Sequence, residues 1–238
     1  MGLKNSKIIQ IYTKNNMVIK GYNMKNIIFI GAGGFASECY TTFIENIKND
    51  RSTFFKGFLS TTNDLKPYGL QHLYLGNYEN YEFSKDDYIL IAIGEPSVRE
   101  ALYYKLKSKG VNFYTLIAKT AVVPNHENIG EGSIIANFVT IAMNTKIGIC
   151  NVLNSHSGIG HDSLIGNFNT FSTFTDICGF TMIGNNNFFT SRCTVLPHSK
   201  IGNNNKFLPA TVVYKKCKNN SIMQGNPALK ICNREDLN

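Results

Sequence analysis

A six-residue repeat of apolar residues constrains the fold of this chain more than any other feature. Every sixth residue is apolar at seventeen consecutive positions: Ile117, Val123, Ile129, Ile135, Ile141, Ile147, Leu153, Ile159, Ile165, Phe171, Ile177, Ile183, Phe189, Val195, Ile201, Phe207 and Val213. Because 43% of all residues are hydrophobic, chance would give such a run in roughly one of a million reading frames. The repeat therefore indicates a structural period.

A period of six fits neither an α-helix nor an isolated strand, whose side chains repeat at about 3.6 and about 2 residues. It fits a triangular prism in which three short strands form one coil of about 18 residues. Glycine often follows the apolar position, and a small or polar residue such as Ser133 or Thr181 often stands two before it. Each coil would bury its interior only against the next coil. The sequence predicts a parallel β solenoid over residues 115–216 and a C-terminal tail over 217–238.

The chain before the repeat alternates short apolar runs with helical stretches. We expect strands at 27–30, 54–59, 88–93 and 113–117, and helices at 36–48 and 98–109. This alternation predicts a small parallel α/β domain, Rossmann-like, over residues 24–114. Residues 1–23 precede a second natural beginning at Met24 and are expected to form an N-terminal extension.

Two turns of this domain follow predicted strands, so a ligand is expected beside them, past the carboxyl ends of the strands. The first turn contains Gly33, Gly34 and Phe35, and its backbone N–H groups at a helix start suit a phosphate. Its glycine spacing meets the dinucleotide fingerprint only weakly, which leaves open a tight turn without a ligand. The second turn contains Gly94 and Ser97.

Composition restricts the partners and the compartment. The net charge is +8, from basic residues scattered along the chain. No helix-turn-helix, zinc-finger or RNA-recognition pattern is present, which favours small phosphorylated ligands over nucleic acid. The six cysteines include no closely spaced pair, as expected for reduced thiols in a cytoplasmic protein. No apolar run approaches the length of about 20 residues that a membrane-spanning helix needs, so no span is expected.

Four motifs together resemble one enzyme family. They are GAGGFASE after the first strand, AIGEPSVRE after the third, IGHDSLIGNF in the solenoid and GNPA near the end. The combination resembles the sialic acid O-acetyltransferases and nucleotide-aminosugar N-acetyltransferases, which are hexapeptide-repeat acyltransferases. The resemblance implies a left-handed parallel β-helix, acetyl-CoA as co-substrate, and a homotrimer with active sites between adjacent β-helices. It also implies a bacterial cytoplasmic enzyme that acetylates sugars for glycans or surface polysaccharide.

The resemblance also implies roles for particular residues. His161 would be the general base, a role that suits an imidazole titrating near neutrality, and Asp162 would orient it. Neighbours on a strand point to opposite faces, so this pairing requires a bend in the backbone. Gly179 stands one coil after His161 and would lie beside the thioester, with its N–H free for the developing oxyanion. Asn154 matches a family asparagine near the acceptor, although an asparagine ladder explains it nearly as well.

The coenzyme and the acceptor are placed in the same way. Pantetheine would run along the later coils, with the phosphates and adenine near Lys215, Lys216 and the turn Gly225, Asn226, Pro227 and Ala228. The acceptor, a nucleotide sugar or a sugar, would contact Gly33, Gly34, Phe35, Gly94 and Ser97. The chain departs from the aminosugar enzymes at Phe35, at Ser60-Thr61 and at Thr170, where those enzymes often have histidine, aspartate and a second histidine.

Three alternatives follow from these observations. The first is O-acetylation of a sialic acid-like sugar instead of N-acetylation of a nucleotide-linked amino sugar, since no residue separates an amine from a hydroxyl acceptor. The second is a non-catalytic β-helix assembly protein, against which His161, Asp162 and Gly179 argue by being in register. The third is a metal enzyme resembling the γ-class carbonic anhydrases. It would need a third histidine on the same corner as His156 and His161, and His126 does not stand a whole number of coils before His156. We therefore expect no metal.

Overall fold

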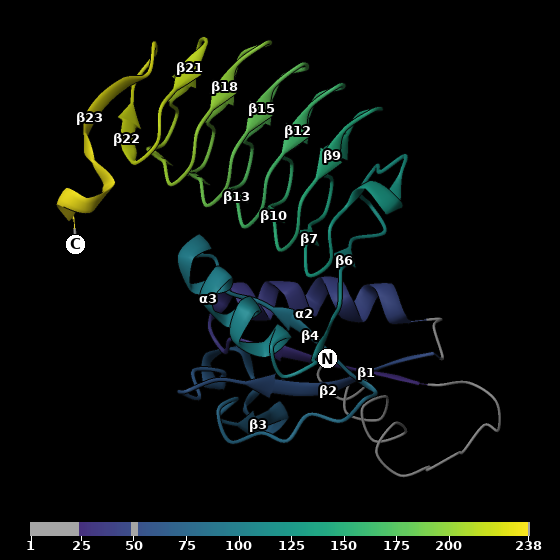
Figure 1. Ribbon diagram of the computed structural model, residues 1–238. Coiled ribbons are helices and arrows are strands. Elements are labelled where there is room, and N and C mark those ends of the chain that lie inside the picture. The colour runs from purple at the N-terminus through teal and green to yellow at the C-terminus, as the bar shows by residue number, and fades with distance from the viewer. Residues whose placement is uncertain (1–23, 49–51, 238) are drawn as a thin grey trace, which may run out of the picture.

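The computed structural model describes residues 24–48 and 52–237 and has two parts (Figure 1). An α/β domain holds the N-terminal part of the described chain, and a prism of stacked coils follows it. The expected extension, residues 1–23, lies outside the described residues. None of the helices in the described part is long and apolar enough to cross a lipid bilayer.

The α/β domain is built on a five-stranded parallel sheet in the order β3-β2-β1-β4-β5. Its elements are β1 (Lys25–Ile30), α2 (Gly34–Ile47), β2 (Thr53–Leu59), the 3₁₀ turns Lys66–Tyr68 and Gln71–Leu73, β3 (Tyr74–Gly76), β4 (Asp87–Ile91), α3 (Pro96–Lys107) and β5 (Asn112–Phe113). The alternating side chains of β1 explain how both faces are covered. Ile27 and Phe29 pack on one face with Phe43 of α2, and Ile28 and Ile30 pack on the other with Leu102 of α3.

Two features of this domain differ from the expectation. The single strand expected at 113–117 is divided into β5, which completes the α/β sheet, and β6 (Leu116–Ile117), which begins the prism. The chain therefore changes from one domain to the other at residues 114–115. Strand β3 was not expected, because so short a segment carries too little periodicity to be recognised.

The prism has three faces, and each is a sheet of mainly parallel strands. Most of these strands are two residues long. The B face contains β6, β7 (Ile134–Ile135), β10 (Val152–Leu153), β13 (Thr170–Phe171), β16 (Phe188–Phe189), β19 (Lys206–Phe207), β22 (Ser221–Gln224) and the antiparallel β23 (Leu229–Asn233). The C face contains β8 (Thr140–Ile141), β11 (Gly158–Ile159), β14 (Asp176–Ile177), β17 (Thr194–Val195) and β20 (Val212–Val213). The D face contains β9 (Lys146–Ile147), β12 (Leu164–Ile165), β15 (Met182–Ile183), β18 (Lys200–Ile201) and β21 (Lys216–Cys217). Two 3₁₀ turns, His126–Asn128 before β7 and Arg234–Leu237 after β23, are the remaining elements of the described residues.

The predicted apolar residues form the interior of the prism. Paired strands are offset by one full coil, as in Leu153 opposite Phe171, so equivalent side chains stack directly. Phe171, Phe189 and Phe207 form a parallel stack with ring centroids 5.0 and 4.3 Å apart. All three are fully buried. This repeated stacking confirms the period read from the sequence.

Most corners of the prism place one residue in the left-handed backbone region. Positive φ values near 60° recur at three series of non-glycine residues: Phe138, His156, Phe174, Arg192 and Ala210; Asn144, Asp162, Phe180 and His198; Cys150, Phe168, Asn186, Asn204 and Asn220. We call the three edges the BC, CD and DB corners after the faces they join. The conformation is unfavourable for non-glycine residues. Hydrogen bonds to the previous coil, such as that from Phe180 N–H to the carbonyl of His161 at 2.9 Å, stabilise it.

The prism continues past the expected end at residue 216. Ile201 pairs with Cys217 and Phe207 with Met223, so this coil is shorter than the preceding ones. The missing residues belong to the CD corner after Val213. Here the six-residue period of apolar residues is interrupted, but the coils continue to stack. Parallel pairing extends through β22, and β23 then folds back along it. A fixed period of six could not identify this shortened corner.

The DB corner of the prism packs against the α/β domain through Arg99 of α3, which is fully buried. Its guanidinium donates to the carbonyls of Ile93 and Gly94, at 2.9 and 2.8 Å. It also donates to three carbonyls of two successive coils, those of Cys150, Phe168 and Asn169, at 3.1, 3.0 and 3.0 Å. Burial lowers the pKa of Arg99 to about 10, which still leaves it charged at neutral pH. The residue joins the two domains and fixes how they are placed.

Candidate active site at the CD corner

His161 lies on the CD corner between β11 and β12, on the outside of the prism. Its neighbour Asp162 has φ 56°, and this turn brings the two side chains to the same side of the backbone. His161 Nδ1 lies 2.7 Å from Asp162 Oδ2. The bend that the pairing requires is therefore present. A carboxylate can only accept a hydrogen bond, so it fixes the proton on Nδ1 and leaves Nε2 as the free basic nitrogen.

Asp162 is held by a second residue that the sequence analysis did not identify. Asn144 occupies the same corner position one coil earlier, and its Nδ2 donates to Asp162 Oδ1 at 3.1 Å. The hydrogen bonds from His161 and then Asn144 lower the pKa of the Asp162 carboxyl. The available sequence signal was the separation of Asn144 and Asp162 by one full coil. This arrangement fixes both oxygens of the carboxylate that orients the imidazole.

Gly179 faces His161 one coil further along the same corner. A Cβ atom built on Gly179 would lie 3.0 Å from His161 Nε2 and 3.1 Å from Cε1. The free nitrogen of the imidazole is therefore directed at a corner residue that lacks a side chain. Among the described residues, none accepts a hydrogen bond from the Gly179 N–H. The basic nitrogen thus lies beside a residue whose backbone N–H is unused within the described part of the chain.

Aromatic residues extend the corner beyond Gly179. The Phe180 ring contacts His161 edge-on, with centroids 5.0 Å apart, and stacks on His198 of the next coil at 4.8 Å. His161 itself is well exposed, with 57% of its side-chain surface accessible. The site is an open corner whose aromatic side restrains the imidazole ring.

Asn154 lies on a different corner from His161. It begins the BC corner and lines a cavity of about 250 Å³ between the prism and α2, together with Phe35 and Glu38. This location brings two of the predicted acceptor residues, Asn154 and Phe35, into one cavity. His156, on the same BC corner, stacks between Phe138 and Phe174, with centroids 4.9 and 5.0 Å apart. His156 and His161 therefore belong to different edges of the prism.

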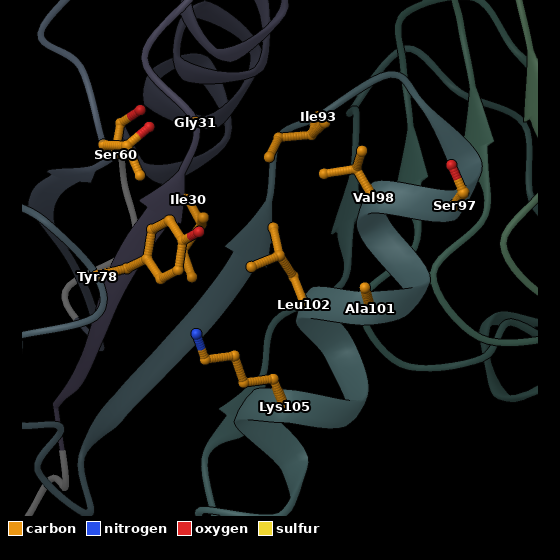
Figure 2. A pocket seen from close by; sticks show the side chains of 11 residues that line it. Ile30, Gly31, Ser60, Tyr78, Ile93, Ser97, Val98, Ala101, Leu102 and Lys105 are labelled. Atoms are coloured by element: carbon orange, nitrogen blue, oxygen red, sulfur yellow. The ribbon is translucent and has the colours of Figure 1, made fainter. Parts of the chain in front are cut away.

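A larger cavity of about 510 Å³ lies past the carboxyl ends of β1 and β4 (Figure 2). The predicted residue Ser97 lines it, and so do Tyr78 and Lys105, which sequence reasoning missed. The Lys105 ammonium is paired with Glu79 at 2.9 Å. Gly31 also lines the cavity, and its φ of 121° requires glycine, because a Cβ would meet the carbonyl oxygen of Ala92 at 2.6 Å. No single signal marked Tyr78 or Lys105, since they come from a loop and a helix face.

The remaining predicted acceptor residues lie between or beside these cavities. Gly33 is the N-cap of α2. A Cβ on Gly34 would approach the Tyr68 hydroxyl at 3.1 Å. The Gly94 carbonyl accepts hydrogen bonds from Arg99 and from Thr170 Oγ1, at 2.8 and 2.7 Å. Thr170 is thereby used in the contact between the domains.

The predicted coenzyme residues gather at the C-terminal end of the prism. The turn Gly225–Ala228 packs beside β20, where Val212 N–H donates to the Gly225 carbonyl and Ala228 N–H to the Val212 carbonyl. The Tyr214 hydroxyl lies 3.1 Å from Asn226 Oδ1. Lys215 and Lys216 are exposed beside this turn. Tyr214, the residue before Lys215, thus contacts the turn. A role of these residues in binding the coenzyme phosphates stays a prediction.

No group of three or more His, Cys, Asp or Glu side chains within residues 24–48 and 52–237 is placed to hold a metal ion. His126 stands in a 3₁₀ turn near the start of the prism, and His156 on the BC corner. The six cysteines are all unpaired thiols.

Comparisons with known proteins support the fold and the N-terminal domain. Residues 26–106 match the family of the PglD N-terminal domain. The acetyltransferase domain of PglB from Neisseria gonorrhoeae FA1090 superposes with a TM-score of 0.75 at 18% identity, covering 87% of this chain and 100% of that one. PerB from Caulobacter crescentus, solved with CoA and GDP-perosamine, gives a TM-score of 0.70 at 20% identity, covering 87% and 97%. WeeI from Acinetobacter baumannii AYE gives 0.62 at 20% identity, covering 87% and 100%. No curated protein sequence matches the chain.

These likenesses confirm the expected fold class, a small parallel Rossmann-like domain followed by a left-handed parallel β-helix. The family match also bears out the resemblance for the α/β domain, since it includes the motifs GAGGFASE and AIGEPSVRE.

Proposed function

We propose that this chain, which has the fold of the hexapeptide-repeat sugar acetyltransferases, transfers an acetyl group from acetyl-CoA to the amino group of a nucleotide-linked amino sugar. The observation that carries the proposal is the CD corner, where His161 Nε2, a fixed Asp162 and the Gly179 N–H converge. A base and an oxyanion donor side by side are the two groups that acyl transfer from a thioester needs.

The mechanism follows from the positions of these groups. The acceptor amine attacks the thioester carbonyl carbon while His161 Nε2 removes a proton from the nitrogen. The carbonyl oxygen becomes an oxyanion and accepts a hydrogen bond from the Gly179 N–H. The C–S bond then breaks, and the thiolate of CoA takes up the proton from His161. Asp162 stabilises the imidazolium that exists between these two transfers, and Asn144 holds Asp162 in place.

The coenzyme is placed on the later coils. PerB was solved with CoA and the PglB domain with acetyl coenzyme A, which supports acetyl-CoA as co-substrate here. The CD corner leads from Gly179 through His198 to Lys215 and the Gly225–Ala228 turn. The exposed lysines supply positive charge for the coenzyme phosphates. Because Gly179 has no side chain, the pantetheine arm can pass close to the backbone.

We place the acceptor in the larger cavity of the α/β domain, residues 24–114, and in the smaller cavity between α2 and the prism. The larger cavity, with Ser97 and Lys105, lies where nucleotides bind in parallel α/β domains. The smaller cavity brings Asn154 and Phe35 toward the reacting end of the sugar. PerB, whose structure contains GDP-perosamine, supports a nucleotide-linked amino sugar as the acceptor class.

His161 and Asn154 stand on different corners of one prism, separated by the C face. A single chain therefore does not bring the base to the smaller cavity. This separation supports a homotrimer in which the CD corner of one copy meets the acceptor cavities of its neighbour.

One observation favours the second candidate, O-acetylation of a sialic acid-like sugar. The larger cavity presents Ser60 and Thr61 where the aminosugar enzymes often carry aspartates, and the described residues that line it include no carboxylate. The imidazole of His161, oriented by Asp162, can act as the base for a hydroxyl as well as for an amine.

The test is release of free CoA from acetyl-CoA with a panel of acceptors. The panel contains UDP-, GDP- and dTDP-linked amino sugars together with free and CMP-linked sialic acid. Turnover on an amino sugar supports the proposal, and turnover only on sialic acids supports the second candidate. A wild-type chain that binds no acetyl-CoA and turns over no acceptor would favour the non-catalytic assembly protein.

The role of His161 is tested in the same assay. His161→Ala should abolish turnover and retain acetyl-CoA binding, because the imidazole acts on the acceptor and not on the coenzyme. Wild-type turnover in His161→Ala would refute the mechanism.

A further inference from the structure

The turn between β4 and α3 and the first residues of α3 form one wall of the larger cavity, to which they contribute Ile93 and Ser97 (Figure 2). Turns of this kind are usually held by their own domain. Here the turn is also held from the β-helix, because Thr170 Oγ1 donates to the Gly94 carbonyl at 2.7 Å. Its position therefore depends on residues far away in the sequence.

A second outside contact comes from the C-terminal 3₁₀ turn. Arg234 Nη2 lies 2.6 Å from Glu95 Oε1, across 139 residues of sequence. The other nitrogen, Nη1, donates to the Asn186 carbonyl at the DB corner, at 2.9 Å. Arg234 thus bridges the β-helix and the α/β domain. Its side chain is 21% exposed and that of Glu95 is 41% exposed, so the pair is partly shielded from water.

The same carboxylate oxygen of Glu95 contacts a side chain that lines the cavity. Ser97 Oγ donates to Glu95 Oε1 at 3.3 Å. Glu95 is also the N-cap residue of α3, and its side chain makes no capping hydrogen bond. Its orientation is therefore set by Arg234 and Ser97. A chain of contacts therefore leads from Arg234 in the C-terminal segment, through Glu95, to the Ser97 hydroxyl that lines the cavity.

We propose that Arg234 is a positioning residue for the acceptor, which holds Glu95 and Ser97 in the orientation that the larger cavity needs. The inference rests on the proposed function for the identity of the ligand, and on the observed contacts for the positioning itself. Arg234 does not line the cavity, so its effect passes through the turn. The C-terminal segment, which the sequence connected only with the coenzyme, then also determines acceptor affinity.

The first measurement uses no ligand. Backbone hydrogen exchange of the peptide containing residues 94–98 is compared in wild type, Arg234→Met and Lys230→Met. The Lys230 ammonium donates to Asn233 of its own segment, so its variant removes a C-terminal charge without touching the turn. We expect exchange to quicken several-fold in Arg234→Met alone. Wild-type exchange in that variant overturns the proposal.

The second measurement uses UDP, GDP and dTDP amino sugars as probes of the full-length protein. The pair is partly exposed, so we expect Arg234→Met to raise the acceptor KM about threefold to tenfold and to leave the KM for acetyl-CoA unchanged. Arg234→Lys keeps the positive charge opposite Glu95 and should restore part of the affinity. An equal rise of both KM values, or no rise, overturns the positioning role. If no probe binds wild type, the assignment of the acceptor fails, and the exchange data still decide whether Arg234 holds the turn.

Discussion

Gly179→Ala is the substitution that most directly tests the geometry of the CD corner. The new Cβ would lie 3.0 Å from His161 Nε2, 3.1 Å from Cε1 and 3.1 Å from the His161 carbonyl oxygen. Ordinary carbon contacts are about 3.5–4.0 Å, so the imidazole must move by a few tenths of an ångström. Gly179 does not have a left-handed φ, so alanine is compatible with its backbone.

The expected effect on catalysis follows from this displacement. A misplacement of about 1 Å costs roughly 100-fold in rate, so a shift of about half that size should lower kcat roughly tenfold. A tenfold loss corresponds to about 1.4 kcal/mol of transition-state stabilisation. The unfolding free energy should change by less than about 1 kcal/mol, because the corner is exposed and the imidazole can turn outward.

The assay is the release of CoA at saturating acetyl-CoA, with thermal unfolding measured in parallel. Gly158→Ala is the matched control, since its Cβ would meet only the ends of two side chains, Asp176 Oδ1 at 3.2 Å and Thr140 Oγ1 at 3.4 Å. It should keep wild-type kcat. Equal kcat values in the two variants would refute the placement of Nε2 against Gly179.

Three further predictions concern stability. Arg99→Leu should lower the unfolding free energy by about 3–5 kcal/mol, because carbonyls buried between the domains lose their charged donor. The midpoint of thermal unfolding should fall by about 10 °C. An unchanged midpoint would contradict the role of Arg99. Phe189→Ala should cost about 3–5 kcal/mol by opening a gap in the central aromatic stack, as checked by urea unfolding, whereas the exposed Phe174→Ala should cost less than about 1 kcal/mol. Burial alone would raise the pKa of Asp87, but a backbone N–H and the Lys56 ammonium outweigh it and lower that pKa. The Asp87 carboxylate therefore stabilises the fold above its unfolded pKa near 4, and this stabilisation is lost as the pH falls through the lower folded pKa. Asp87→Asn should reduce the dependence of the unfolding free energy on pH at acid pH. An unaltered dependence would show that this carboxylate does not cause the acid destabilisation.

Much of the β-helix could be predicted because its information is local and repeated. Every coil has an apolar residue at every sixth position. The pattern holds at seventeen consecutive positions, so a single irregularity does not hide it. The same register placed Gly179 one coil after His161, and the structure puts them in contact. The shortened corner before Cys217 escaped prediction, because it breaks the register on which the prediction depended.

The candidate site was predicted only in part. His161 and Asp162 were found through a motif, and the left-handed backbone at Asp162 explains why adjacent side chains meet. Asn144 was missed although it lies in register with Asp162, because a polar corner residue is common in such a repeat. Arg99 was also missed, since nothing in a helical segment shows that one arginine will be buried against another domain.

The sequence by itself determined the period, the stacking of the coils and the position of the histidine corner, since these depend on spacing along one chain. The tertiary structure alone decided where the two domains meet, that Asn154 shares a cavity with Phe35 of α2, and that Arg234 reaches Glu95. The physical reason is distance along the chain: a contact across 139 residues leaves no periodic trace, because it depends on how the two domains pack against each other.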